Sequence, residues 1–147
     1  MTYFSASTVA TFFIILLSTS FLMFSCASNQ NEMDLENQTI EEIAQLIDEE
    51  VGSADADSAD QCNIIPIGVK PAGGPWGYLV YSNKSTDEEK LKKLVDRYNK
   101  LDEKRNIEQD AFSTADFATE PELTIKNGRC HGQGIYAWNP GEVKEKV

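Results

Sequence analysis

Residues 85–105 read STDEEKLKKLVDRYNKLDEKR, and this stretch decides how the rest of the chain can fold. It opens with side chains that cap helices, followed at once by acids that favour a helix N-terminus. Its apolar residues recur at helical spacing, and they are Leu91, Leu94, Val95, Tyr98 and Leu101. The pattern predicts an amphipathic helix from Asp87 to Lys104 with one buried face and one solvated face of mixed charge.

Strand patterns lie on both sides of this helix. Upstream, Cys62–Ile67 is apolar and β-branched, and Tyr78–Ser82 is rich in aromatic and branched residues. Pro66 lacks an N–H group and confines the first strand to a sheet edge. Downstream, residues 122–133 read as a hairpin around Asn127-Gly128, the strongest short-range signal for a tight turn. We therefore predict an α+β fold, in which one long amphipathic helix packs on a short, mainly antiparallel sheet.

The chain has three cysteines, and two of them flank the predicted domain. Cys62 opens the first predicted strand, and Cys130 lies on the second strand of the hairpin. A disulfide between them would tie the hairpin to the start of the sheet and would contribute roughly 4 kcal/mol on the chain-entropy model. Because disulfides persist in oxidising compartments, the pair predicts an exported protein.

The third cysteine, Cys26, follows an apolar run at residues 9–24. The run has the length of a secretory signal core and is short for a helix that crosses a membrane. Together with the small residue before it, Cys26 resembles the lipobox of bacterial lipoproteins, in which the cysteine receives acyl chains and the signal, here residues 1–25, is removed. The resemblance implies a lipid anchor in the cell envelope, outer membrane or cell surface. Cleavage after Ala27 and a retained N-terminal anchor are the alternatives.

Charge divides the rest of the chain into two parts. Residues 26–61 hold eleven of the 24 acids and no Lys or Arg, whereas residues 62–147 hold 13 acids and all 13 bases. The acidic part predicts a flexible spacer, because it offers little apolar surface to offset its ordering entropy. A short helix at 39–51 is indicated inside it by the capping box of Thr39 and Glu42. We expect that helix to be marginal in water, and docking on the domain is the alternative. The domain at 62–147 is expected to end in a polar tail.

A loop rich in Pro and Gly is the candidate binding surface, because it presents a backbone of defined shape and a large aromatic side chain. Its candidate residues are Pro71, Gly73, Gly74, Pro75 and Trp76. Trp76 has an alternative role as part of the core. Trp138 has the same two alternatives, as a packed final strand or as an exposed tail residue.

Catalytic chemistry finds little support in the sequence. The single histidine, His131, follows Cys130 directly, so on a strand the two side chains point to opposite faces. The acidic run 55–60 fails the calcium-loop pattern, and no nucleotide or zinc motif is present. We therefore expect no catalytic residue, no metal and no cofactor, and a neutral domain behind an acidic spacer is a poor match for nucleic acid.

Residues 62–82, residues 94–99 and the ending Asn127-Gly-Arg-Cys130 resemble a group of small exported bacterial domains with paired cysteines. The resemblance implies a compartment and a class of domain, and no particular activity. We expect a lipid-anchored, non-enzymatic binding module whose partners are the membrane and an envelope or extracellular protein or glycan. The alternative is an inhibitor of an extracellular hydrolase, and an enzyme without visible motifs is a third possibility.

Overall fold

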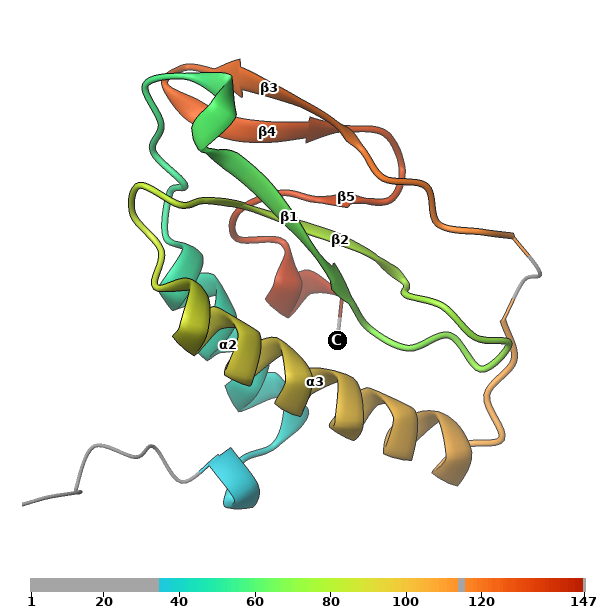
Figure 1. Ribbon diagram of the computed structural model, residues 1–147. Helices are drawn as coiled ribbons and strands as arrows, with labels where there is room; N and C mark the ends of the chain where they lie inside the picture. The colour runs from blue at the N-terminus through green and yellow to red at the C-terminus, as the bar shows by residue number, and fades with distance from the viewer. Residues whose placement is uncertain (1–34, 114–115, 147) are drawn as a thin grey trace, which may run out of the picture. The chain divides into compact units, whose positions relative to one another are not determined.

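The computed structural model describes residues 35–113 and 116–146 (Figure 1). These residues belong to one compact unit, which spans Asp34–Val147. The expected signal segment and Cys26 lie outside the described residues. Within the described part, no helix combines the length and the apolar character needed to cross a membrane.

Two helices, α2 (Ile40–Val51) and α3 (Glu88–Glu108), pack against each other on the same side of the sheet (Figure 1). The predicted capping box starts α2, because the Thr39 side chain accepts from the backbone N–H of Glu42 while the Glu42 carboxylate accepts from the N–H of Thr39. The side chain of Asp87 caps α3 by accepting from the N–H of Lys90. The sequence predicted that this helix ends at Lys104, but it continues to Glu108.

The docking of α2 corrects the expectation of a marginal helix in a flexible spacer. One stripe of this helix is buried in the core. It consists of Ile40, Ile43, Ala44, Ile47 and Val51. Burial of a large aliphatic side chain contributes about 1.5–3 kcal/mol, so the four large residues of this stripe oppose the ordering entropy of the helix by an amount that its acidic composition did not suggest. The packed domain therefore begins near Leu35, well before Cys62.

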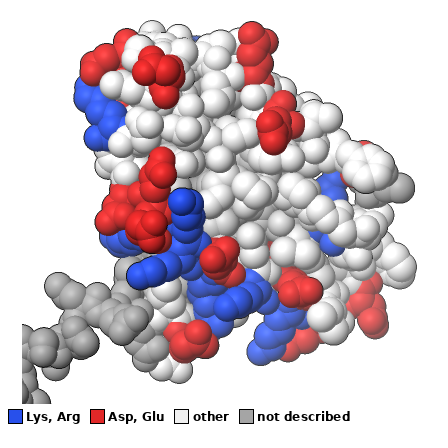
Figure 2. Space-filling view, in the orientation of Figure 1, with Lys and Arg blue, Asp and Glu red and all other residues white. Residues whose placement is uncertain are grey.

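The acids of this segment contact bases of the domain, which is the second reason that the segment is ordered. Glu50 lies 2.7 Å from Lys90 Nζ, and its carboxylate also accepts from the backbone N–H of Asp87 at 2.8 Å. Asp57 lies 2.7 Å from Lys84 Nζ. Figure 2 shows Lys and Arg side chains gathered over α3 beside acidic ones. The uneven charge of the sequence is thus partly balanced in the folded unit.

The main sheet has three strands in the order β1 (Cys62–Ile67), β2 (Gly77–Ser82) and β5 (Ala137–Trp138). Strand β1 pairs with β2 in the antiparallel sense, and β5 pairs with β2 in parallel. The edge position of β1 agrees with the presence of Pro66 in it. The predicted α+β class with a mainly antiparallel sheet is confirmed, and the second packed helix adds to it.

The predicted hairpin forms a separate two-stranded sheet from β3 (Glu122–Lys126) and β4 (Arg129–Gln133). At its turn Asn127 and Gly128 both have positive φ, of 54° and 72°. Two successive positive φ values are what a type I′ turn requires, and Asn and Gly tolerate them better than other residues.

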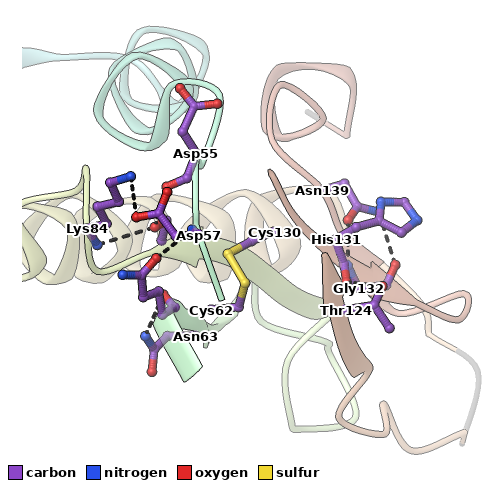
Figure 3. The surroundings of a disulfide bond; sticks show 12 residues. Asp55, Asp57, Cys62, Asn63, Lys84, Thr124, Cys130, His131, Gly132 and Asn139 are labelled. Carbon is purple, nitrogen blue, oxygen red and sulfur yellow. Dashed lines mark hydrogen bonds and ion pairs between the residues drawn. A yellow bond between two sulfur atoms is a disulfide. The ribbon is translucent and has the colours of Figure 1, made fainter. Parts of the chain in front are cut away.

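The predicted disulfide between Cys62 and Cys130 is present and joins β1 to β4 (Figure 3). The acidic run before β1 also pairs with the hairpin. The N–H of Cys130 donates to the carbonyl of Ala54, and Asp55 forms an isolated backbone β-bridge with Arg129. These contacts place the end of the expected spacer inside the folded unit.

The C-terminal segment is packed as well, which corrects the expectation of a polar tail. The described part of the chain also has three short 3-10 turns, at Leu35–Asn37 (η1), Ala59–Gln61 (η2) and Val143–Glu145 (η3). Val143 is fully buried, and the carboxylate of Asp48 on α2 accepts from the N–H groups of Val143 and Lys144. Trp138 is buried on β5, so of its two alternatives the packed strand is correct.

Candidate ligand-binding site

A cavity of about 580 Å³ lies between the loop that connects β1 to β2, the C-terminal half of α3 and the segment around β5. Aromatic and donor side chains form most of its wall. The lining residues are Lys70, Trp76, Tyr98, Arg105, Asn106, Gln109, Asp116, Ile135, Tyr136, Trp138 and Lys146. The volume lies within the range of 300–1,000 Å³ that is usual for small-molecule sites. Both tryptophans of the chain line this cavity.

Helix α3 holds the β1–β2 loop in place through polar side chains one or two turns apart. Asn99 accepts from the N–H of Gly68 at 2.7 Å, and Asp102 accepts from the N–H of Val69 at 2.8 Å. Asn106 donates to the carbonyl of Val69 at 2.5 Å. Because residues 99, 102 and 106 share one helix face, they can bind consecutive backbone groups of the loop. The loop is therefore anchored where it enters the site.

Asp102 is the most unusual of these side chains, because it is charged and fully buried. It occupies the apolar stripe of α3 where the sequence pattern placed Leu101, which is only half-buried. Its second oxygen lies 2.7 Å from Arg105, whose side chain is partly exposed to the cavity. A buried carboxylate needs such partners, so Asp102 links the loop backbone to a cationic residue of the site.

The four residues from Pro71 to Gly74 form the tip of the loop, and all of them are exposed. Gly73 donates to the carbonyl of Lys70, and Lys70 donates to the carbonyl of Gly74, so the tip is a hydrogen-bonded turn. Of the predicted binding residues, Trp76 lines the main cavity, while Pro71 lines a smaller hollow beside it. Trp76 is half-buried, so it combines the two roles considered for it.

Packing against Trp76 explains a glycine at the loop entrance. Gly68 has a φ of +76°, and a Cβ atom there would lie 2.5 Å from Cδ1 of Trp76. Any other residue would therefore face both backbone strain and a steric clash. The absence of a side chain at Gly68 thus lets the Trp76 indole pack closely against the loop backbone.

Lys70 is the central cation of the site, and it is 4% exposed. Its ammonium lies 3.1 Å from Asp116 Oδ2 and 3.0 Å from the Asp116 carbonyl oxygen. It also lies over the rings of Trp76 and Tyr136, at 5.6 Å and 5.4 Å from their centroids. A carboxylate and two π-faces together compensate the charge that folding has removed from water.

Tyr136 completes this cluster by donating a hydrogen bond from its hydroxyl to Asp116. That bond, followed by the one from Lys70, lowers the pKa of Asp116 below its usual value. The same bond to Asp116 raises the pKa of Tyr136. Near neutral pH the cluster therefore holds an ionised carboxylate and a neutral phenol.

Sequence reasoning found Trp76 and missed Lys70, Asp102, Asp116 and Tyr136. Asp102 had a detectable signal, because it lies at i+4 from Tyr98 and so on the apolar face of a helix that was otherwise well predicted. The other three come from separate loops that only the fold brings together. No local pattern marks them.

The other predicted features lie away from the cavity. His131 is half-buried on β4, where the Thr124 hydroxyl donates to its carbonyl oxygen (Figure 3). Cys130 beside it is bonded to Cys62 and cannot act as a thiolate nucleophile. Among the residues that the structure describes, no group of three or more His, Cys, Asp or Glu could hold a metal ion.

No protein-family model, no curated protein and no solved structure matches this chain. The resemblance to small exported domains therefore stays a prediction.

Proposed function

We propose that this protein is an exported, lipid-anchored binding module without catalytic activity, and that its ligand occupies the cavity around Trp76 and Tyr136. The observation that carries the proposal is the construction of this cavity from three loops and a helix around the buried Lys70. Rigid aromatic walls with a few fixed polar groups are typical of small-molecule and cofactor sites. The buried ammonium of Lys70 is paired with the carboxylate of Asp116, and the buried carboxylate of Asp102 is paired with Arg105, so these charges favour a structural role over proton transfer.

The disulfide supports export, because cysteines paired in this way are usual in oxidising compartments. If Cys26 carries the acyl chains, only residues 27–34 separate it from η1, and they span at most roughly 30 Å. The longer spacer expected from the sequence, residues 26–61, would have reached roughly 120 Å. On this proposal the domain works close to the membrane surface. Mass spectrometry of the mature N-terminus tests the anchor, and an unmodified terminus at Ser28 would reject it.

The binding proposal is tested with a variant that blocks the cavity. Gln109 is exposed at the end of α3 and lines the cavity, so Gln109→Trp places a large ring in the cavity without changing the core. Lys104→Trp on an exposed position of the same helix is the matched control. With Cys26→Ser in all three proteins, so that no acyl chain holds them on the membrane, we expect the labelled parent chain and the control to bind isolated cell envelopes, and the blocked variant to lose binding. Equal binding by all three proteins would reject the cavity as the site.

Inhibition of an extracellular hydrolase is a second candidate, and the exposed turn at residues 71–74 favours it. Asn99 and Asp102 fix the backbone just before this turn, so it could enter an enzyme cleft with little loss of entropy. A panel of secreted proteases and glycosidases, each assayed with the purified chain, tests the idea. It is rejected if no member of the panel is slowed.

A further inference from the structure

The polar side chains that line the cavity are mainly hydrogen-bond donors. Arg105, Asn106, Gln109 and Lys146 contribute guanidinium, amide and ammonium groups. The side chains of Gln109 and Lys146 have no hydrogen-bond partner within residues 35–113 and 116–146, whereas the carboxylate of Asp116 already accepts from Lys70 and Tyr136. The donor groups that remain available in the cavity therefore suit a ligand that accepts hydrogen bonds and carries negative charge.

The apolar part of the wall is aromatic and contains little aliphatic surface. Trp76, Tyr136 and Trp138 provide rings, and Ile135 is the single branched aliphatic residue that residues 35–113 and 116–146 contribute to the lining. Ile135 is also 84% exposed, so it lies at the rim and does not form an apolar floor. An acyl chain would find few partners here. A ligand ring that has an apolar face and a polar edge would match both the aromatic side chains and the hydrogen-bond donors of the cavity.

Lys146 strengthens the cationic side of the cavity. Its ammonium lies 5.9 Å from the centroid of the Trp138 ring, so it projects over an aromatic wall and stays exposed. Arg105 lines the cavity too and is held by Asp102 at 2.7 Å. Both cations line the same cavity as the rings, so the cavity offers positive charge beside its aromatic wall.

From this arrangement we propose that the cavity binds an acidic sugar, a carboxylate-bearing ring of an envelope or extracellular glycan. The carboxylate contacts Lys146 and the Gln109 amide, and the sugar ring lies against Trp76 and Tyr136. The volume of about 580 Å³ holds one or two sugar rings, so a longer glycan would extend into solvent. The inference rests on the proposed function, because it names the ligand of that same site.

The chain reports on this site through its own fluorescence, since its two tryptophans both line the cavity. The full chain in mild detergent is titrated with trigalacturonic acid, with triglucuronic acid and with the methyl esters of both. Esterification removes the negative charge and keeps the rings. We expect at least one acid to change the fluorescence and to bind about tenfold more tightly than its ester, because a charge-assisted hydrogen bond is lost.

Two lysine variants locate the contact. Lys146→Ala should weaken binding of the acid about tenfold and leave binding of the ester unchanged, whereas Lys104→Ala, which removes the same charge from an exposed site outside the cavity, should change neither. Equal binding of acid and ester overturns the acidic ligand and leaves the binding module intact. If neither acid binds while Gln109→Trp still abolishes envelope binding, the ligand class is again wrong. If neither acid binds and Gln109→Trp binds envelopes as well as the parent chain, the proposed function is overturned as well.

Discussion

Replacing Ile47 with alanine tests whether α2 is part of the folded core. The side chain of Ile47 is fully buried between α2 and the rest of the domain. The substitution removes three carbon groups, worth about 0.8 kcal/mol each in transfer free energy. With the cavity that remains, we expect the free energy of unfolding to fall by about 3 kcal/mol, within the range of roughly 2–5 kcal/mol seen for such truncations. That is a large part of the 5–15 kcal/mol typical of a small domain.

The assay is urea unfolding of the full chain, followed by tryptophan fluorescence. Gln45→Ala is the matched control, because Gln45 lies on the exposed face of the same helix. We expect its midpoint to change little, by about 0.5 kcal/mol or less in free energy. A marginal helix that does not dock would tolerate Ile47→Ala equally well. Equal midpoints for the two variants would therefore refute the docked helix.

Three further outcomes follow from the structure. Replacing both Cys62 and Cys130 with alanine should cost about 4 kcal/mol, because the bridge closes a loop with a sequence separation of 68, and a loss below about 1 kcal/mol in urea unfolding would contradict this. Burial raises the pKa of Tyr98 to about 12, so folding favours its neutral form; stability should be complete below pH 10 and should fall by about 2–3 kcal/mol as pH rises from 10 to 12. Tyr98→Phe should lose less stability over that window, and an unchanged alkaline transition would contradict the assignment. Gly132→Ala would place a Cβ atom 2.8 Å from Val80 and should cost about 1–3 kcal/mol, which thermal unfolding can measure; an unchanged midpoint would show that β4 can move away.

Features that depend on neighbours in the chain were predictable. The helix α3, the capping box at Thr39, the Asn127-Gly128 turn and the edge strand with Pro66 each follow from local stereochemistry. The short strand β5 was not certain from sequence, because two residues show no periodicity. Its parallel pairing with β2 exists only because the chain returns to that edge after the hairpin.

The candidate site illustrates the same division. Trp76 stood out in the sequence as a large aromatic residue in a loop of restricted shape. Lys70, Asp116 and Tyr136 did not, since their roles arise from contact across sequence separations of 20 and 46 residues. A lysine in a loop reads as solvated until two aromatic rings and a carboxylate are shown to enclose it.

The amino-acid sequence by itself determined the α+β class, the helix α3, the strands β1 to β4 and the disulfide, because periodicity, capping and turn chemistry act over a few residues and the two cysteines had few alternatives. The tertiary structure decided where the domain begins, what the acidic segment does and where the cavity lies. Composition measures the charge of the acidic segment but does not show that its apolar stripe meets α3 and that Glu50 meets Lys90. Burial and charge pairing depend on partners distant in the chain, and only the fold brings those partners together.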